Sequence, residues 1–358
     1  MKHVCVSLCY GLLPLSPLPS LLTFFKMHWL EQYWYRLAAL HLLLWPLSIL
    51  FAALAAARRF LYRSGLFAST QVGVPVVVVG NINAGGTGKT PCVIWLVQWL
   101  LDHGFKPGVI TRGYGGSARE SQHAAPDGDP AALGDEAVLL ARRCACPVWI
   151  GRSRVAAAGA LRAAHPECNV IISDDGLQHY ALKRDVELVV LDGERGHGNG
   201  MLLPAGPLRE PLRRLESVDA LVINGGAAFP LETLPAGVPA FDMRLEGNAF
   251  YALRDPRRVV DAGHFASQNV CAIAAIGNPQ RFFNSLHELG ISFTPRAFPD
   301  HHAYTAEDCA SGTHTALIMT EKDAVKCERL DGENWWMLRV DAAIDPALGE
   351  LILQKIRK

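Results

Sequence analysis

The chain has 358 residues, of which 50% are hydrophobic and 19% charged, a composition that suits about two folded domains and excludes a largely disordered protein. Lys plus Arg and Asp plus Glu balance at 34 each, but residues 1–64 hold six of the basic residues and one of the acidic. The remaining chain is therefore acidic, which gives no argument for nucleic-acid binding. Nine cysteines, an odd number scattered along the chain, suit a reducing compartment better than a disulfide framework.

The first predicted element is an apolar helix. Residues 37–57, "LAALHLLLWPLSILFAALAAA", contain no Asp, Glu, Lys or Arg and as a helix would measure about 31 Å, close to the thickness of a bilayer's hydrocarbon. His41 and Pro46 leave a buried core helix as an alternative, and the pattern does not separate a spanning helix from one that lies in the interface. Aromatic residues precede the run and basic residues follow it, as expected for a membrane segment with a cytoplasmic basic flank: Trp29, Tyr33, Trp34, Tyr35, Arg58, Arg59 and Arg63.

Residues 1–26 contain Lys2, an apolar stretch and "SPLPS", which raises the possibility of a cleaved signal peptide. We disfavour it because export would carry the glycine loop described next away from nucleotide, and because Met27 offers an alternative start. We therefore assign residues 1–26 as an N-terminal extension that need not begin the native protein. Residues 27–64 are assigned as a membrane-associated helix with aromatic and basic flanks.

A glycine-rich loop, "GNINAGGTGKTP" at residues 80–91, follows the apolar run "VPVVVV" and precedes a helical pattern at residues 93–101. The strict P-loop spelling needs Gly where Asn83 stands. Strand, glycine loop and helix N-terminus nevertheless form an anion site, in which Lys89 reaches phosphates and the Thr90 hydroxyl is placed for Mg²⁺. The alternative is a flexible turn. We assign nucleotide binding to Asn83, Ala84, Gly85, Gly86, Thr87, Gly88, Lys89 and Thr90.

Strand-like runs then recur, separated by helical patterns at residues 135–143 and 154–164: "KPGVIT", "CPVWI", "NVIISDD", "VELVVLD" and "ALVING". This alternation predicts a P-loop NTPase-like α/β/α domain with a parallel, doubly wound sheet, whose ligands bind at the carboxyl ends of the strands. We assign it to residues 65–235. A second, smaller α/β domain is expected over residues 236–358, contributing to the active-site cleft, because the runs "VCAIAAIG" and "HTALIMTEKDAV" follow a Gly/Pro-rich stretch.

Acidic residues at strand ends are the metal-side candidates. Asp174 and Asp175 follow the run "NVIIS", the arrangement by which P-loop proteins hold Mg²⁺ opposite phosphates. Glu210 in "LREP" is a third candidate, although a surface salt bridge with its neighbour Arg209 explains it nearly as well. With Thr90, these are the expected metal ligands.

A kinase also needs a group that accepts the proton of the attacking hydroxyl. The candidates are Asp135 in "LGDEA" and the neighbours Asp300 and His301 in "FPDHH". Taken alone, Asp135 could be a helix N-cap and His301 a surface histidine. Their spacing does not pair them.

Several other functions fit part of the pattern. Switch ATPases with a "KGGxGKT" loop use its first lysine across a dimer, and that position is Ala84. A GTPase would need an Asn-Lys-x-Asp element to recognise guanine. In "TEKD", Lys322 stands directly beside Asp323, so the spacing is wrong. A membrane anchor with a relict P-loop would not need Asp135, Asp174 or Asp175, which the chain retains. A kinase of another glycolipid stays open.

Motifs along the chain resemble, in order, those of the tetraacyldisaccharide 4′-kinase (lipid A 4′-kinase) family: "GNINAGGTGKTP", "RGYGG", "GDEA", "GRSR", "DDGLQH", "GHGNGMLLPAGPLREP", "FPDHH" and "TEKDAVK". The resemblance runs from about residue 29 to the C-terminus. It implies Mg²⁺-dependent transfer of the γ-phosphoryl group of ATP to the 4′-hydroxyl of an acylated glucosamine disaccharide 1-phosphate. The implied location is the cytoplasmic face of the Gram-negative inner membrane, with the lipid as partner, no nucleic acid and no obligatory protein partner.

The resemblance also implies residue roles. Asp135 is the expected base, working with His301 and its neighbour Asp300, and five further residues are candidates to hold phosphates or substrate: Arg112, Tyr114, Arg152, Arg154 and Arg209. Three residues depart from the family pattern, namely Ala137, Leu177 and His197, where Pro, Phe and Phe are usual. None is a reacting group, so we expect them to alter loop geometry more than activity.

Overall fold

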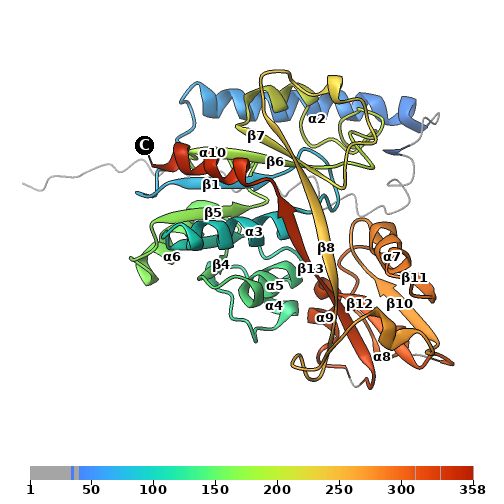
Figure 1. The fold of residues 1–358 in the computed structure, drawn as a ribbon. Helices are drawn as coiled ribbons and strands as arrows, with labels where there is room; N and C mark the ends of the chain where they lie inside the picture. Colours follow the sequence, from blue (N-terminus) through green and yellow to red (C-terminus); the bar gives the residue numbers. More distant parts are fainter. Residues whose placement is uncertain (1–33, 36–39, 311, 331, 358) are drawn as a thin grey trace, which may run out of the picture.

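The computed structural model describes residues 34–35, 40–310, 312–330 and 332–357. The assignment of residues 1–26, and most of the flank before residue 40, lies outside the described residues. Within them, thirteen strands form one mixed sheet, flanked by helices (Figure 1).

One half of the sheet is parallel and lies in the first part of the chain. Its strands follow one another across the sheet in this order: β4 (Val148–Ile150), β2 (Pro107–Thr111), β5 (Val170–Asp174), β1 (Val76–Gly80), β6 (Val186–Asp192) and β7 (Ala220–Asn224). A short strand, β3 (Gln122–His123), pairs antiparallel with β4 at the edge. The predicted doubly wound parallel sheet is confirmed.

Both faces of this half are covered, which explains why its strands are continuous apolar runs. Every residue of β1 is buried; Val77 and Val79 join one core while Val76 and Val78 join another, as side-chain alternation along a strand requires. Helices α3 (Lys89–Asp102) and α5 (Asp135–Arg143) pack in the first core, and α6 (Arg154–Ala164) packs in the second. A short helix, α4 (Pro130–Leu133), precedes α5.

The other half is built from the C-terminal part of the chain. Strand β10 (Val270–Ala274) pairs in parallel with β11 (Phe293–Ala297) and with β12 (Ala316–Thr320). Helix α7 (Pro279–Glu288) packs on one face, and α8 (Ala306–Cys309) and α9 (Glu321–Cys327) pack on the other.

Two long antiparallel strands join the halves, β8 (Ala240–Ala252) and β13 (Trp335–Ile344) (Figure 1). The start of β8 pairs with β7, the start of β13 pairs with β12, and β9 (Val259–Val260) pairs with the end of β8. The pairing is irregular between Arg339 and Asp341. Gly247 lies opposite, where a Cβ atom would stand 2.1 Å from the Arg339 carbonyl oxygen, so only glycine fits there.

The last helix, α10 (Pro346–Ile356), returns to the first half. Its residues Leu348 and Ile352 lie in the same core as Leu96 and Val97 of α3. The stretch 236–358 therefore does not pack as one separate unit, because its final helix completes the core of the P-loop half.

Helix α2 (Leu40–Arg63) lies along the body of the protein. The His41 ring nitrogen Nδ1 is 2.8 Å from the Ala205 carbonyl oxygen, the Ser48 hydroxyl donates to the Leu202 carbonyl at 2.9 Å, and Arg59 donates to Ser217 at 2.9 Å. By length and composition α2 could cross a membrane, and only 11% of its apolar window is buried. Its exposed large apolar residues are Leu42, Leu43, Trp45, Leu47, Ile49, Leu50, Leu54 and Phe60.

Candidate active site

The glycine loop connects the end of β1 to the start of α3. Gly85 and Gly88 adopt φ angles of 96° and 94°, in the left-handed region that favours glycine. Gly88 is also the N-cap of α3 and supplies no side-chain acceptor. The first N–H groups of α3 therefore have no capping side chain, which leaves them available to an anion.

Side chains and backbone from later segments hold this loop in place. The Asn83 amide donates to the Gly196 carbonyl at 2.8 Å, the backbone N–H of Ala84 donates to the Pro207 carbonyl at 2.7 Å, and Asn224 donates to the Thr87 carbonyl at 3.1 Å. Asn83, which stands where the strict motif has glycine, thus ties the loop to its neighbour.

Lys89, at the start of α3, faces the carboxyl end of β5. Its Nζ lies 3.5 Å from Asp175 Oδ1, and Arg209 Nη1 lies 3.2 Å from both oxygens of the same carboxylate. Burial alone would raise the pKa of Asp175, but the charges of Lys89 and Arg209 hold this pKa well below its usual range. Asp175 is therefore ionised, and it faces Lys89 at the end of the glycine loop.

Asp174 is the more buried member of the pair, at 1% exposure. Its Oδ2 accepts a hydrogen bond from the Thr111 hydroxyl at 3.2 Å, while its Oδ1 has no hydrogen-bond partner. Burial raises the pKa of Asp174 to about 7, and the nearby charges of Glu136 and Asp175 add to the effect. A buried carboxylate with an unpartnered oxygen is an arrangement that a cation would stabilise.

Glu210 is 4% exposed and its oxygens face protein donors. Oε1 accepts from Gln178 at 2.9 Å and Oε2 from the Tyr180 hydroxyl at 2.6 Å, with Arg214 Nε at 3.4 Å. It is a buried ion pair, unlike the surface salt bridge that the sequence left open. Glu210 fixes the loop that carries Arg209.

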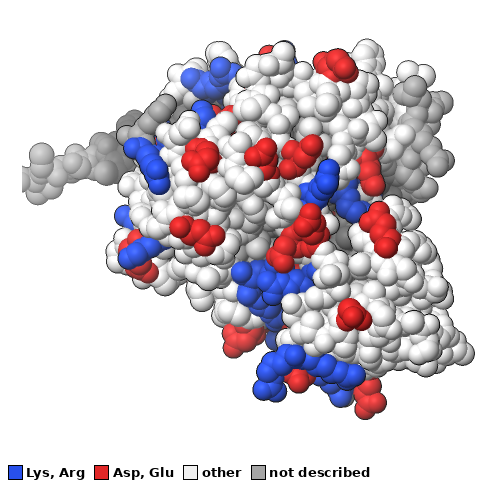
Figure 2. All heavy atoms as spheres, in the orientation of Figure 1, with Lys and Arg blue, Asp and Glu red and all other residues white. Residues whose placement is uncertain are grey.

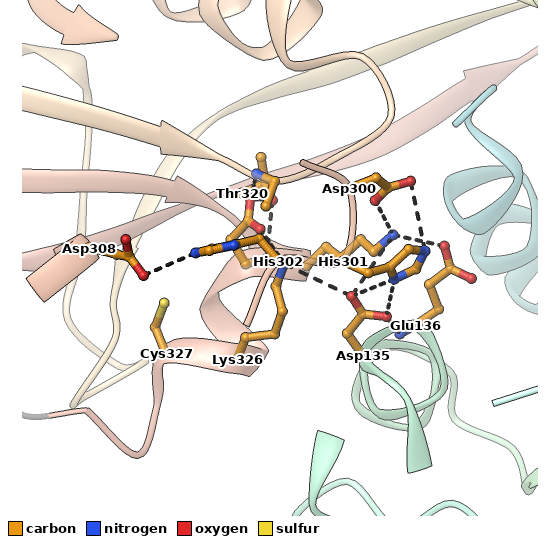
Figure 3. A network of polar contacts seen from close by, with 12 residues as sticks. Asp135, Glu136, Asp300, His301, His302, Asp308, Thr320, Lys326 and Cys327 are labelled. Atoms are coloured by element: carbon orange, nitrogen blue, oxygen red, sulfur yellow. Dashed lines mark hydrogen bonds and ion pairs between the residues drawn. The ribbon is translucent and has the colours of Figure 1, made fainter. Parts of the chain in front are cut away.

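Asp135 and His301 meet although 166 residues separate them (Figure 3). Asp135 is in the first turn of α5 and 5% exposed, and His301 Nδ1 lies 3.1 and 3.0 Å from its two carboxylate oxygens. His301 has a φ of 61°, and the Tyr114 ring lies 4.7 Å from the imidazole. Their spacing in the sequence does not predict this pairing. The contact between the two halves of the sheet brings the two side chains together.

The charges around this pair explain its titration. Burial alone would raise the pKa of Asp135, but the hydrogen bond from His301 and the charges of Lys322 and Lys326 hold it at about 2. Burial would lower the pKa of His301, whereas the hydrogen bond to Asp135 raises it, and the net change is upward. Sequence reasoning had not assigned the two lysines, although the motif "TEKDAVK" contained both.

Arg154 and Arg152 lie at a cavity of about 300 Å³ that His179 also lines. Arg154 is 2% exposed and donates to the carbonyl oxygens of Gly151 and Asp174, at 3.0 and 2.9 Å. It therefore supports the end of β5. Burial and the charge of Arg154 lower the pKa of His179 to about 3, so this ring is neutral. The motif "DDGLQH" contains His179, but the sequence alone does not predict a role for it.

The remaining substrate candidates occupy a single loop. Arg112 is partly buried and Tyr114 is 47% exposed, both in the loop after β2. The charge of Arg112 contributes to the lowered pKa of His179, so the two side chains are within electrostatic reach of each other.

A turn from the C-terminal half covers the glycine loop. Gly277, between β10 and α7, approaches Gly86 so closely that a Cβ atom on Gly277 would lie 2.1 Å from the Gly86 nitrogen. Beside it, Asn278 and Arg281 contact Asp192 at the end of β6, at 3.4 and 2.9 Å. The P-loop and this turn therefore touch backbone to backbone.

Comparison with known proteins decides the family. The model of the tetraacyldisaccharide-1-P 4′-kinase family matches residues 40–357. The chain belongs to this family. It is 49% identical over 330 residues to the tetraacyldisaccharide 4′-kinase of Methylobacillus flagellatus, with 92% of this chain and 96% of that protein covered. The corresponding protein of Chromobacterium violaceum is 50% identical over 339 residues, with 92% and 98% covered.

A solved structure agrees with the fold. LpxK from Aquifex aeolicus, crystallised in complex with ATP, superposes with a TM-score of 0.73 at 28% identity, and the match covers 88% of this chain and 99% of that one. The resemblance inferred from motifs is confirmed. The chain is a member of the tetraacyldisaccharide 4′-kinase family with a P-loop fold.

The three departures from the family pattern lie in packed positions. Ala137 is fully buried in the first core, and Leu177 is fully buried with its Cβ against Gly80, where a Cβ on the glycine would be 2.6 Å away. The His197 ring lies 5.2 Å from that of Phe229. These residues therefore act here through packing.

Proposed function

We propose that this protein transfers the γ-phosphoryl group of ATP to the 4′-hydroxyl of a tetraacyldisaccharide 1-phosphate, a step of lipid A biosynthesis. The observation that carries the proposal is one arrangement at the carboxyl ends of the parallel strands. There a glycine loop with Lys89 faces the Asp174–Asp175 pair, and a buried carboxylate is hydrogen-bonded to a histidine nearby. The names of the related proteins suggest the acceptor.

In this proposal residues 83–90 hold the phosphates of ATP. The uncapped N-terminus of α3 and the loop N–H groups supply donors, and Lys89 supplies a positive charge that stabilises the charge developing during transfer. The phosphorus forms a bond to the 4′-oxygen and breaks its bond to the β–γ bridging oxygen, so that ADP leaves.

Mg²⁺ fits the residues present. Asp174 carries a buried oxygen without a partner, and we assign it, Asp175 and the Thr90 hydroxyl to the metal side. Mg²⁺ bound with ATP neutralises phosphate charge. Within the described part of the chain no group of three or more His, Cys, Asp or Glu side chains is arranged for a metal, which agrees with a cation held mostly by phosphates. Glu210 stays a prediction, since binding a cation would compete with Gln178 and Tyr180.

Asp135 is the proposed acceptor of the hydroxyl proton. Its carboxylate is ionised and its orientation is fixed by the His301 imidazole at 3.0 Å. As the 4′-oxygen bonds to phosphorus, its proton passes to this pair. Asp300 helps to place the histidine, its Oδ2 being 3.8 Å from His301 Nε2.

The lipid is proposed to reach the site from a membrane interface on which α2 lies. Contacts from His41 to Arg59 fix one side of α2 to the body, while its other side exposes large apolar residues. This arrangement favours a helix that lies in the interface over one that spans. Arg58, Arg59 and Arg63 at its end favour the cytoplasmic face. On the face drawn in Figure 2, acidic and basic side chains are interspersed.

The sugar headgroup, with its 1-phosphate, is proposed to contact the loops that carry the remaining candidates. These are Arg112, Tyr114, Arg152, Arg154 and Arg209; of these, Arg152 is exposed at the cavity, whereas Arg154 acts by holding the backbone.

The test is incubation of detergent-solubilised protein with Mg²⁺, γ-labelled ATP and tetraacyldisaccharide 1-phosphate. Label is expected on the lipid at the 4′ position. Asp135→Asn and Lys89→Ala are each expected to lower kcat at least about 100-fold, whereas Lys106→Met, which changes an exposed lysine, should leave it unchanged. ATP consumption without labelled lipid would contradict the proposed acceptor. Near-normal turnover by either variant would contradict the role assigned to that residue.

A further inference from the structure

The first turn of α9 brings a lysine into the cluster around Asp135. Lys322 Nζ donates to Glu136 Oε1 at 3.0 Å and to Asp300 Oδ1 at 3.1 Å, and it lies 4.0 Å from Asp135 Oδ2. Its side chain is 14% exposed. One cation from the C-terminal half thus contacts carboxylates on two other segments, α5 and the loop that carries His301.

The position of Lys322 is itself fixed. Thr320 caps α9 by accepting from the Asp323 N–H, and the Thr320 hydroxyl donates to Asp323 Oδ2 at 2.6 Å. The same oxygen of the fully buried Asp323 accepts from the backbone N–H of Ala275 at 3.1 Å. Helix α9 therefore begins at a point anchored to the end of β10, and Lys322 projects from a rigid base.

The charges in this cluster require such a cation. Three carboxylates, those of Asp135, Glu136 and Asp300, meet in a largely buried place, where like charges would raise each other's pKa. The other groups that face Asp135 are Lys326, 4.0 Å away on α9, and His301, whose ring lies tilted against that of Tyr114. Lys326 also pairs with Asp323 at 2.8 Å. Burial would lower the pKa of Lys322, yet Glu136, Asp300 and Asp135 raise it well above its usual value, so it is charged.

We propose that Lys322 is a positioning residue for the phosphoryl transfer, because it holds the loop of His301 against α5 and keeps the Asp135–His301 pair in its proton-accepting state. It does so without touching the reacting atoms. The proposal rests on the proposed roles of Asp135 and His301. It explains why the "TEKD" segment, which comes from the C-terminal half, belongs to the site.

A matched control is offered by Arg143, at the other end of α5. Arg143 is 7% exposed at its side chain and pairs with Glu321 and Asp341, so it also ties α5 to the C-terminal half. It stands eight residues after Asp135, about 12 Å along the helix. Removing Arg143 weakens the contact between the halves without changing the charge beside the base.

The experiment compares pH profiles of kcat for the full-length protein, Lys322→Met, Lys322→Arg and Arg143→Met. The Lys322 charge lowers the pKa of His301, whose ordinary value lies near neutrality. Loss of this charge should therefore move the ascending limb for Lys322→Met to higher pH by at least about one unit. kcat near neutrality should fall at least about 10-fold, with the KM for ATP little changed. Lys322→Arg should restore the position of the limb, and Arg143→Met should not move it.

Three outcomes overturn the proposal: an unmoved limb in Lys322→Met, equal shifts in Lys322→Met and Arg143→Met, or failure of Lys322→Arg to restore the limb. Thermal unfolding of each variant shows whether it is folded, and Lys322→Arg decides the question if Lys322→Met is not. The Asp135→Asn variant separates this inference from the proposed function. If Asp135→Asn retains normal turnover, the assigned base is wrong; if it is inactive and the limb of Lys322→Met is unmoved, only the role of Lys322 fails.

Discussion

At the scale of single residues, the contact between His301 and Asp135 links stability to pH. The pKa of His301 is raised in the folded protein. The protonated form of its ring is therefore more favourable in the folded protein than in the unfolded chain. This contribution is fully present below about pH 6.5, the ordinary value for histidine, and is lost as the pH rises through the folded pKa. His301→Gln should therefore destabilise the protein more in acid than in alkali.

Urea unfolding of the parent and His301→Gln proteins at about pH 5.5 and pH 9, on either side of the ordinary histidine pKa, measures this effect. The difference in unfolding free energy should be larger at the lower pH. The same comparison in an Asp135→Asn background removes the partner carboxylate, and there the pH dependence of the difference should shrink. A difference that is equal at both pH values would contradict the pairing.

Residue roles were predictable where chemistry was local. The glycine loop, Lys89 and the adjacent aspartates follow from a strand, a turn and a helix start. The pairing of Asp135 with His301 came from the family resemblance and not from their spacing, because the two lie on segments 166 residues apart. The spacing of Lys322 in "TEKD" does not suit a guanine-reading element, and only the fold shows that this lysine faces Asp135, Glu136 and Asp300.

At the scale of elements, the close approach of Gly277 to Gly86 leaves no room for a side chain on Gly277. A methyl group on Gly277 would lie 2.1 Å from a backbone nitrogen of the glycine loop, so Gly277→Ala should push the β10–α7 turn away from that loop. We expect kcat/KM for ATP to fall about 10- to 100-fold, because displacements near 1 Å at a catalytic site have effects of this size.

The matched control is Gly159→Ala. Gly159 is exposed in α6 and nothing lies within 4 Å of a Cβ there, so alanine should leave the kinetics unchanged and stabilise the helix by about 0.5–1 kcal/mol. Steady-state kinetics with varied ATP distinguishes the two. Unchanged kcat/KM in Gly277→Ala would show that the turn does not affect the nucleotide site.

Helix α2 carries the second prediction at this scale. Leu43 and Leu50 are 76% and 57% exposed and make up part of its apolar side. Replacing both by Glu should lower binding to phospholipid vesicles at least about 100-fold, since burying each leucine contributes about 1.5–3 kcal/mol. Folding should be preserved because neither side chain is buried.

Co-sedimentation with vesicles measures the partition. Leu231→Glu, which changes a leucine 56% exposed and remote in sequence from α2, is the control and should bind like the parent. Equal binding of the double variant and the parent would exclude α2 as the membrane contact.

Elements were predicted best where burial is complete. Predicted helices at residues 135–143 and 154–164 coincide with α5 and α6, and the apolar runs became β1, β2, β4, β5, β6 and β7. Helix α3 begins at Lys89, four residues before the apolar pattern at 93, because the end of the glycine loop is already helical. Strand β8 was not predicted, although residues 241–246 alternate between apolar and polar side chains; most of its residues are exposed or half-buried.

At the scale of the whole molecule, segments that pack together are often far apart in the sequence. The Gly/Pro-rich stretch before residue 236 predicted a second, smaller α/β domain that contributes to the active-site cleft, and the structure adds that β8 and β13 continue one sheet through both halves. The chain then returns to the P-loop half through α10. No local sequence pattern predicts this packing of α10. It depends on an apolar face of α3 that is covered by residues about 250 positions later in the chain.

The return of α10 makes the stability of the nucleotide site depend on the C-terminus. Ile352 is fully buried in the core that also contains Leu96 and Val97 of α3. Ile352→Ala should lower the free energy of unfolding by about 2–5 kcal/mol through lost burial and a cavity. Gln354→Ala on the exposed side of the same helix should change it by less than about 0.5 kcal/mol.

Hydrogen exchange locates the effect. If α10 belongs to the P-loop core, Ile352→Ala should speed exchange in α3 and β1 more than in β10 and β12, because local opening follows shared packing. Faster exchange confined to β10 and β12 would instead mean that α10 stabilises the C-terminal half, and would contradict the assignment of its core. The expected result would show that the helix carrying Lys89 is held by residues from the far end of the chain.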